Sequence, residues 1–357
     1  MQSLFRKPGR AQVFLCVAVM LAALMCGHRA FGDEIHDAAS DGNVKQVKTL
    51  LKHNPDLVSS KDENGATPLH EAALNGQKKV VELLLTKKVE VDARNNDGLT
   101  PLHEAAAGDH RDVAELLLAN NAQINARDNN GETPLHTAAA KGSLDVAELL
   151  LTNNADIKAK DNRGATPLHE AAAKGFKDVA ELLLANKADM NARDNRNGTP
   201  LHEVAAGGFR DVVELFVTNN AEVNVRDGIG TTPLLDAVIM GHADVAELLL
   251  TNNAEVNARD HNGRTSLHYA ALGCQHQKDV AALLLAYNAD VNARDGNRAT
   301  PLHYAAAGSH RDVVELLLIK KADVNAVDNS GRTPLYYATT KGTPAVAELL
   351  RQHGGHE

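Results

Sequence analysis

Seven histidines stand at the same place in a recurring phrase of this 357-residue chain, and histidine commonly serves as a metal ligand or proton-transfer group. Consecutive copies should lie one helix-packing distance apart, about 8–10 Å, whereas zinc ligands converge at about 2.0–2.1 Å on one ion. We therefore predict no metal site and no catalytic role, and expect each imidazole to hydrogen-bond to backbone or to the threonine three residues earlier. The histidines are His70, His103, His136, His169, His202, His268 and His303.

A calcium site is also excluded by spacing. The stretch "NNDGLTPLHE" has an Asp-Gly pair followed by Glu104, as at the end of an EF-hand loop. The first ligand position of such a loop would fall on Ala93, which offers no side-chain oxygen. We predict that the chain binds no metal ion and no cofactor.

Cys274 and His276 form the remaining pair with nucleophilic potential, because a thiolate beside an imidazole can be reactive. The sequence places no orienting carboxylate beside them, so we expect Cys274 to be a bystander thiol. Pairing with a second chain is the alternative. No catalytic residue is predicted, and the protein is not expected to be an enzyme.

The phrase that holds the histidines recurs with a fixed period, which is the mark of a repeat architecture. Seven of the eight steps are 33 residues long, and the step from 265 to 300 is 35 residues because "ALGCQHQKDV" carries two extra residues. The marker threonines are Thr67, Thr100, Thr133, Thr166, Thr199, Thr232, Thr265, Thr300 and Thr333.

Each unit is predicted to be a pair of helices followed by a turn. Thr100 is expected to be a helix N-cap, with Pro101 at the first helical position. We expect Asp112 to cap a second helix through "VAELLLAN". The following "INARDNNG" has turn chemistry and predicts a hairpin-like finger. Arg298 stands where other fingers have glycine.

The phrase Thr-Pro-Leu-His-x-Ala at this period resembles the signature of the ankyrin repeat family. The resemblance covers nearly all of 33–357 and implies an all-α solenoid of about ten stacked helix–turn–helix units with hairpin-like finger loops. It also implies protein–protein recognition on the concave face, and that each motif histidine has a structural role. The expected repeats are 33–63 (N-terminal capping), 64–96, 97–129, 130–162, 163–195, 196–228, 229–261, 262–296 (with the two-residue insertion), 297–329 and 330–357 (C-terminal capping).

The two ends of the array differ from its middle. Internal repeats place an aliphatic residue third in the Leu-Leu-Leu run of the second helix, whereas the ends place Lys52 and Arg351 there. Terminal repeats have one face in water, and such polar caps keep a solenoid soluble. We therefore expect a monomer.

Residues 1–32 are predicted to be a signal peptide. Arg6, Lys7 and Arg10 precede the apolar run "AQVFLCVAVMLAALMC", and "AFG" before Asp33 has the small residues that a signal peptidase reads. An uncleaved membrane anchor is the alternative, although the run is short against the roughly 20 residues needed to span a bilayer. We expect a periplasmic or secreted protein with no membrane association after cleavage.

The net charge limits the class of partner. Removal of 1–32 leaves 33 Lys plus Arg against 46 Asp plus Glu. Nucleic acids and anionic lipids need a basic footprint, so we expect neither. A protein partner remains.

The residue directly after the motif histidine, here called the slot position, is the candidate partner-binding set. It is acidic in five of its first six copies and tyrosine in the last three. An acidic stretch would steer a basic segment of a partner, and tyrosines are frequent interface anchors. The candidates are Glu71, Glu104, Glu170, Glu203, Asp236, Tyr269, Tyr304 and Tyr337, with Thr137 between them.

Several alternatives remain open at this stage. The slot pattern can arise from duplication of neighbouring repeats without selection for binding. Recognition can lie instead on the fingers, for which Arg163 and Arg264 are test positions. The protein can also be an architectural spacer in the periplasm or at the cell surface, or, with least support, an enzyme accessory subunit.

Overall fold

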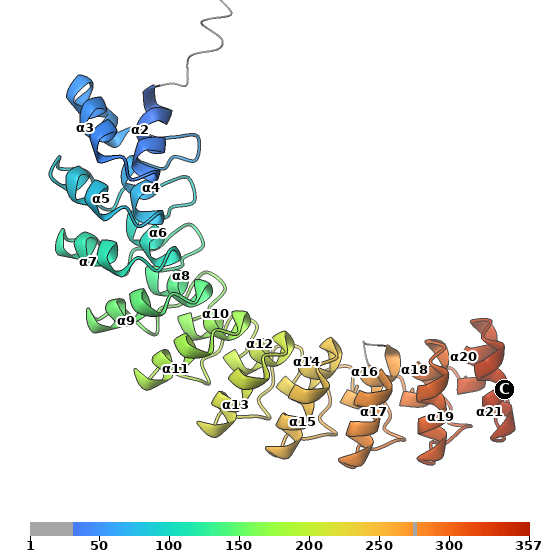
Figure 1. The fold of residues 1–357 in the computed structure, drawn as a ribbon. Coiled ribbons are helices and arrows are strands. Elements are labelled where there is room, and N and C mark those ends of the chain that lie inside the picture. The colour runs from blue at the N-terminus through green and yellow to red at the C-terminus, as the bar shows by residue number, and fades with distance from the viewer. Residues whose placement is uncertain (1–30, 274–276) are drawn as a thin grey trace, which may run out of the picture. The chain divides into compact units, whose positions relative to one another are not determined.

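The computed structural model describes residues 31–273 and 277–357, and within these ranges it contains twenty α-helices, one 3-10 helix and no strand (Figure 1). The described part of the chain divides into two compact units, with the boundary between residues 123 and 124. Within each unit the even-numbered helices pack on one another and the odd-numbered helices flank them. The predicted all-α solenoid of helix pairs is confirmed. The predicted signal peptide, except for its last two residues, lies outside the described residues, as do Cys274 and His276.

The even-numbered helices, here called inner helices, begin each pair. They are α2 (Phe31–Ser40), α4 (Pro68–Leu74), α6 (Pro101–Ala107), α8 (Pro134–Lys141), α10 (Pro167–Lys174), α12 (Pro200–Gly207), α14 (Pro233–Met240), α16 (Ser266–Leu272), α18 (Pro301–Ala307) and α20 (Pro334–Thr340).

The odd-numbered helices, here called outer helices, complete each pair. They are α3 (Val44–His53), α5 (Lys78–Leu85), α7 (Arg111–Ala119), α9 (Leu144–Thr152), α11 (Lys177–Ala185), α13 (Arg210–Thr218), α15 (Ala243–Thr251), α17 (Gln277–Ala286), α19 (Arg311–Ile319) and α21 (Pro344–Gln352). The 3-10 helix η1 (Pro55–Ser59) follows α3.

The start of each inner helix follows the sequence prediction. Thr133 is the N-cap of α8, and its amide donates to Nδ1 of His136 at 3.2 Å. Nε2 of the same ring donates to the carbonyl of Ala165 in the next repeat at 3.1 Å. Burial lowers the pKa of His136, which favours the neutral ring that this pattern of donor and acceptor needs. The motif histidine is therefore a capping group and a tie between repeats.

The outer helices begin earlier than predicted. His110, not Asp112, is the N-cap of α7, and Asp112 lies in the first turn. Nε2 of His110 makes a 3.0 Å hydrogen bond with the carbonyl of Leu74 in the preceding repeat. His110 thus links two repeats at this turn, and Asp112 interacts favourably with the helix dipole instead.

Close packing of the inner helices depends on small residues. Ala105 and Ala106 of α6 have no exposed surface, and the same is true of Ala138 and Ala139 of α8. Small side chains let neighbouring helices approach closely, and the leucines and valines of both helices fill the remaining core. At the ends of the array Lys52 and Arg351 are exposed, as the capping prediction requires.

An aspartate organises each finger of the second unit. Oδ1 of Asp161 accepts hydrogen bonds from the amides of Arg163 and Ala165, both at 2.8 Å. The amide of Asp161 donates to the carbonyl of Ala165 at 2.9 Å and closes the loop. The amide of Asn162 donates to the carbonyl of Asn130 in the previous finger at 2.8 Å. These closed, stacked loops are the predicted hairpin-like fingers.

Two fingers have a residue other than glycine at the position that needs a positive φ. Arg298 has φ 62° and Asn197 has φ 59°, whereas Gly164 occupies the same position with φ 79°. The prediction that Arg298 is an isolated exception is therefore wrong. Both residues adopt a backbone conformation that favours glycine and is tolerated best by asparagine.

None of the helices in residues 31–273 and 277–357 combines the length and the apolar character that crossing a bilayer requires.

Candidate partner-binding face

The slot positions lie one turn into the inner helices, beside the fingers. Most slot side chains are half-buried, whereas Glu170 is buried and Glu203 is exposed. In the unit 124–357 the inner helices α8 to α20 follow one another along one side (Figure 1), and each of them carries one slot residue. We call this surface, together with the residues one helical turn later, the inner-helix face.

The finger aspartate faces the slot residue of its own repeat. Its Oδ1 holds the finger turn, as Asp295 does for the amides of Asn297 and Ala299 at 2.9 and 2.8 Å. Its Oδ2 faces the side chain nine residues later, which is the slot residue. What the slot residue offers this oxygen differs among the repeats.

The three slot tyrosines give the finger aspartate a hydrogen-bond donor. Their hydroxyls donate to Oδ2 of Asp260, Asp295 and Asp328 at 2.6, 2.7 and 2.7 Å, respectively. Burial and the hydrogen bond to Asp295 raise the pKa of Tyr304 to about 12, so the hydroxyl remains neutral. The tyrosine hydroxyls hold the fingers, and the three tyrosines remain half-buried.

Arg264 lies between two of these tyrosines. Its Nε donates to the hydroxyl of Tyr304 at 3.0 Å. Its guanidinium carbon lies 5.9 Å from the ring centre of Tyr269 and 5.4 Å from that of Tyr304, within cation–π range. The ring of Tyr304 also meets His268 edge-on at 5.6 Å. Tyr304 is therefore fixed by three neighbours.

Arg163 lies among three carboxylates of the second unit. Its Nε contacts Oδ2 of Asp161 at 2.8 Å, and its Nη2 contacts Glu170 at 2.5 Å and Glu132 at 3.5 Å. The carboxylate oxygens of these three residues lie within 4.8 Å of one another, close enough to suit a metal ion. The guanidinium makes the contacts that a cation would make there.

Two slot carboxylates of the second unit, Glu203 and Asp236, face a finger carboxylate, and neither slot residue forms an ion pair with the described residues. Burial, followed by the charges of Asp194 and Glu170, raises the pKa of Glu203. Burial, followed by the charge of Asp227, raises the pKa of Asp236 to about 7. These repeats place two acceptors opposite each other.

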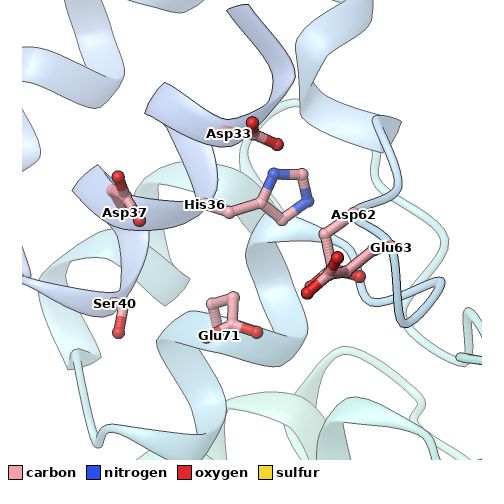
Figure 2. Close-up of a pocket in the computed structure, with 7 residues that line it drawn as sticks. All are labelled: Asp33, His36, Asp37, Ser40, Asp62, Glu63 and Glu71. Carbon is pink, nitrogen blue, oxygen red and sulfur yellow. The ribbon is translucent and has the colours of Figure 1, made fainter. Parts of the chain in front are cut away.

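In the first unit the two acidic slots differ. Nδ2 of Asn95 donates to Oε1 of Glu104 at 3.4 Å, so this pair is complementary. Glu71 faces Asp62 instead, and burial followed by that charge raises the pKa of Glu71. Glu71 lines an acidic hollow of about 380 Å³ shown in Figure 2, together with Asp33, His36, Asp37, Ser40, Asp62 and Glu63.

Sequence reasoning missed the apolar residues one turn after the slot. In the second unit this position holds alanine in most repeats, but Ile239 and Leu272 occupy it in α14 and α16 and are 37% and 46% exposed. Met240 beside them is 55% exposed. A hollow of about 160 Å³ lies between α18 and α20 and is lined by His303, Tyr304, Ala307 and Tyr337 among others. Reading the position three residues after the slot would have revealed this apolar patch.

The other edge of the fingers is basic, and its charges hold neighbouring repeats together. Nη1 of Arg127 donates to the carbonyl of Lys160 at 2.7 Å, and Nζ of Lys160 donates to the carbonyl of Arg193 at 2.8 Å. Arg193 continues the row by donating to the carbonyl of Arg226 at 2.9 Å. We call this the finger row.

Comparisons with known proteins agree with this architecture. A family model described as ankyrin repeats (3 copies) matches residues 35–128, 125–194, 201–295 and 267–357, and one described as ankyrin repeats (many copies) matches residues 177–217. Among solved structures, the ankyrin repeat domain of human ASB11 is similar with a TM-score of 0.58 and 29% sequence identity. The alignment covers 63% of this chain and 99% of that domain's chain.

Similarity to individual curated proteins covers short stretches. The probable E3 ubiquitin-protein ligase XBOS32 of Oryza sativa subsp. japonica is 37% identical over 67 residues, which is 18% of this chain and 14% of that protein. The NAD-capped RNA hydrolase NUDT12 of Homo sapiens is 37% identical over 54 residues, which is 15% of this chain and 12% of that protein. The chain thus spans a small part of each relative.

Proposed function

This chain belongs to the ankyrin repeat family, and we propose that it is a non-enzymatic scaffold that binds a protein partner outside the cytoplasm. Repeats of this family generally serve as scaffolds for protein–protein interaction and are typically not enzymes. The partner lies on the inner-helix face of residues 124–357. One observation carries this proposal: along this face the slot side chains change from carboxylates to tyrosines flanked by exposed aliphatic residues.

The aromatic half supplies the binding energy. Ile239, Met240 and Leu272 expose apolar surface next to the tyrosine slots, and an exposed apolar patch is typical of an interaction site. The tyrosine rings are held by their hydroxyl groups, so they lose little conformational freedom when a partner binds. A large apolar side chain of the partner would enter the hollow between α18 and α20.

The acidic half attracts the partner. Glu203 and Asp236 lie opposite Asp194 and Asp227, and these negative charges add to burial in raising the pKa of both slot carboxyls. A basic segment of a partner would be steered to this half and held in one orientation, because charge complementarity acts mainly on the association rate and on register.

The proposed location rests on the sequence of residues 1–32. A basic start, an apolar run and small residues before Asp33 are the features of a secretory signal peptide. Material purified from the native host should therefore begin near Asp33 and fractionate outside the cytosol. An N-terminus at Met1, or recovery solely from the cytosol, would contradict export.

Affinity capture of the tagged full-length chain from its native host, followed by kinetic measurements on the captured protein, tests the binding face. Tyr304→Ala and Tyr337→Ala should each raise the dissociation rate about tenfold or more, the effect of losing an interface anchor. Asp236→Asn should lower the association rate and weaken its salt dependence. Tyr287→Ala, a half-buried tyrosine just after α17, is the matched control.

The finger row is the competing surface, and it needs its own variants. Variants of Arg163 and Arg264 cannot distinguish the two surfaces, because these arginines contact Glu170 and Tyr304 of the inner-helix face. Arg193→Ala and Arg226→Ala change the finger row alone. If these two abolish binding while the slot variants leave it unchanged, recognition lies on the fingers.

An architectural spacer is the second candidate. It is favoured by the tyrosine hydroxyls, which are used within their own repeats and give the slot a structural role. A spacer predicts that Tyr304→Ala changes stability, that no protein is captured stoichiometrically, and that the exposed aliphatic residues tolerate polar replacement without loss of function.

A further inference from the structure

Oδ2 of the finger aspartate receives a donor in four repeats of the second unit. Three of these donors are the slot tyrosines. In the fourth, Nε of Arg163 donates to Oδ2 of Asp161 at 2.8 Å, and its Nη2 reaches the slot residue Glu170. A carboxylate in the slot is thus compatible with a finger carboxylate when a guanidinium bridges the two.

The repeat of Asp236 has the two carboxylates but lacks the guanidinium. Its finger residue Asp227 uses Oδ1 to accept from the amides of Ile229 and Thr231 at 3.0 and 2.7 Å. Ile229 occupies the place that Arg163 holds two repeats earlier and is 65% exposed. In the part of the chain that the structure describes, no arginine, lysine or tyrosine donates to either carboxylate.

A buried hydroxyl lies at the same place. Thr231 is 3% exposed, and its Oγ1 has no partner within hydrogen-bond distance among the described residues. The hydroxyl lies near the Asp236 carboxyl and lowers the pKa of that group, against the larger upward effects of burial and of Asp227. The site therefore presents two carboxylates and a buried hydroxyl oxygen, all of which can accept hydrogen bonds.

We propose that Asp227 and Asp236 bind the guanidinium of an arginine side chain presented by the protein partner. This inference rests on the proposed function and names the chemistry of one contact in it. The planar guanidinium has five donors in a fixed fork, so it can bridge the two carboxylates as Arg163 bridges Asp161 and Glu170, and donate to Thr231 as well. A lysine ammonium lacks this fork.

The surroundings of the pair suit an arginine. Ile229 and Ile239 expose aliphatic surface on which the methylene stem can lie. Glu203 on α12 adds negative charge. The donors of the next repeat are already engaged. Arg264 donates to the hydroxyl of Tyr304, and the hydroxyl of Tyr269 donates to Asp260. The repeat of Glu203 is a weaker candidate, because the charges of Arg163 and Arg196 already oppose the rise in the pKa of that exposed carboxyl.

The test uses the full-length chain with N-acetyl-arginine amide as probe and the citrulline analogue, which has the same shape without the charge, as control. Binding is followed by carbon NMR of the Asp236 carboxyl. Arginine binds the ionised carboxyl, and with a pKa of about 7 the affinity should be about tenfold higher at pH 8 than at pH 6. The citrulline probe should leave the signal unchanged.

Three substitutions make the test specific. Asp236→Asn should abolish binding of the probe, and Asp244→Asn, which removes the same charge from the exposed start of α15, should leave binding intact. Ile229→Arg should build the arrangement of Arg163 into this repeat, lower the pKa of Asp236 and prevent probe binding. Circular dichroism of each variant checks that the helices remain folded.

The outcomes separate this inference from the proposed function. Equal binding of arginine and citrulline probes, no binding at pH 8, or unchanged binding in the Ile229→Arg variant would overturn the arginine site. If a captured partner depends on Tyr304 but tolerates Asp236→Asn and Ile229→Arg, the proposed function stands and the arginine contact is wrong. If the probe binds as expected but no partner is found, the site stands without the function.

Discussion

Replacing Tyr304 with phenylalanine tests how the inner helices hold the fingers. The change removes a 2.7 Å hydrogen bond to Asp295 and a 3.0 Å hydrogen bond from Arg264 while keeping the ring. A hydrogen bond to a charged group contributes about 1.5–3 kcal/mol. Because Tyr304 is only half-buried, we expect a loss of about 1.5 kcal/mol in the local free energy of opening.

Hydrogen exchange at the finger amides measures this loss directly. The amides of Asn297 and Ala299 donate to Oδ1 of Asp295, so a loosened aspartate should raise their exchange rates about tenfold. Tyr287→Phe is the control, because the Tyr287 hydroxyl has no hydrogen-bond partner among the described residues. Exchange at wild-type rates in the Tyr304→Phe variant would refute the view that this hydroxyl positions the finger.

Three further predictions concern stability and assembly. The pKa of Asp236 is raised to about 7. The protonated carboxyl therefore stabilises the folded state fully below the unfolded pKa of about 4, and this stabilisation is lost as pH rises through 7. Asp236→Asn should raise the free energy of unfolding at pH 8 by about 2 kcal/mol and reduce the pH dependence of that free energy between pH 5 and 8. Urea titration measures both effects, and an unchanged pH profile would contradict this. Ser266 begins α16 with a fully buried hydroxyl that has no hydrogen-bond partner in residues 31–273 and 277–357. Ser266→Pro should stabilise the chain by about 1 kcal/mol, because proline suits the first helical position, and a lower melting temperature would show otherwise. Arg351→Leu should extend the apolar stripe of α21 and promote end-to-end association, whereas an unchanged monomer in light scattering at high concentration would count against the capping argument.

The helix pairs could be predicted because their signals are local. Thr133 and His136 lie within one turn of each other and form the capping box at the start of α8. The start of the outer helix was predicted wrongly because Asp112 is the residue type preferred at an N-cap, whereas α7 begins directly after His110. Phe176 occupies the same position before α11, so the residue type at the cap does not decide where the outer helix begins.

The pairing of finger and slot could not be predicted from residue type alone. The two side chains are nine residues apart in sequence, and the finger meets the helix only after the turn has formed. Reading the two positions together would still have been informative. Asn95 faces Glu104 and Asp295 faces Tyr304, which are complementary pairs, whereas Asp236 faces another aspartate. The mismatch marks the place where an external donor is needed.

Hydrogen exchange of the chain in complex with its captured partner tests the central claim most directly. The account predicts protection of peptides from α14, α16, α18 and α20, strongest around Tyr304 and Tyr337. It also predicts no change in the outer helices α15, α19 and α21. Protection confined to the outer helices, or to the finger row at Arg193 and Arg226, would contradict binding on the inner-helix face.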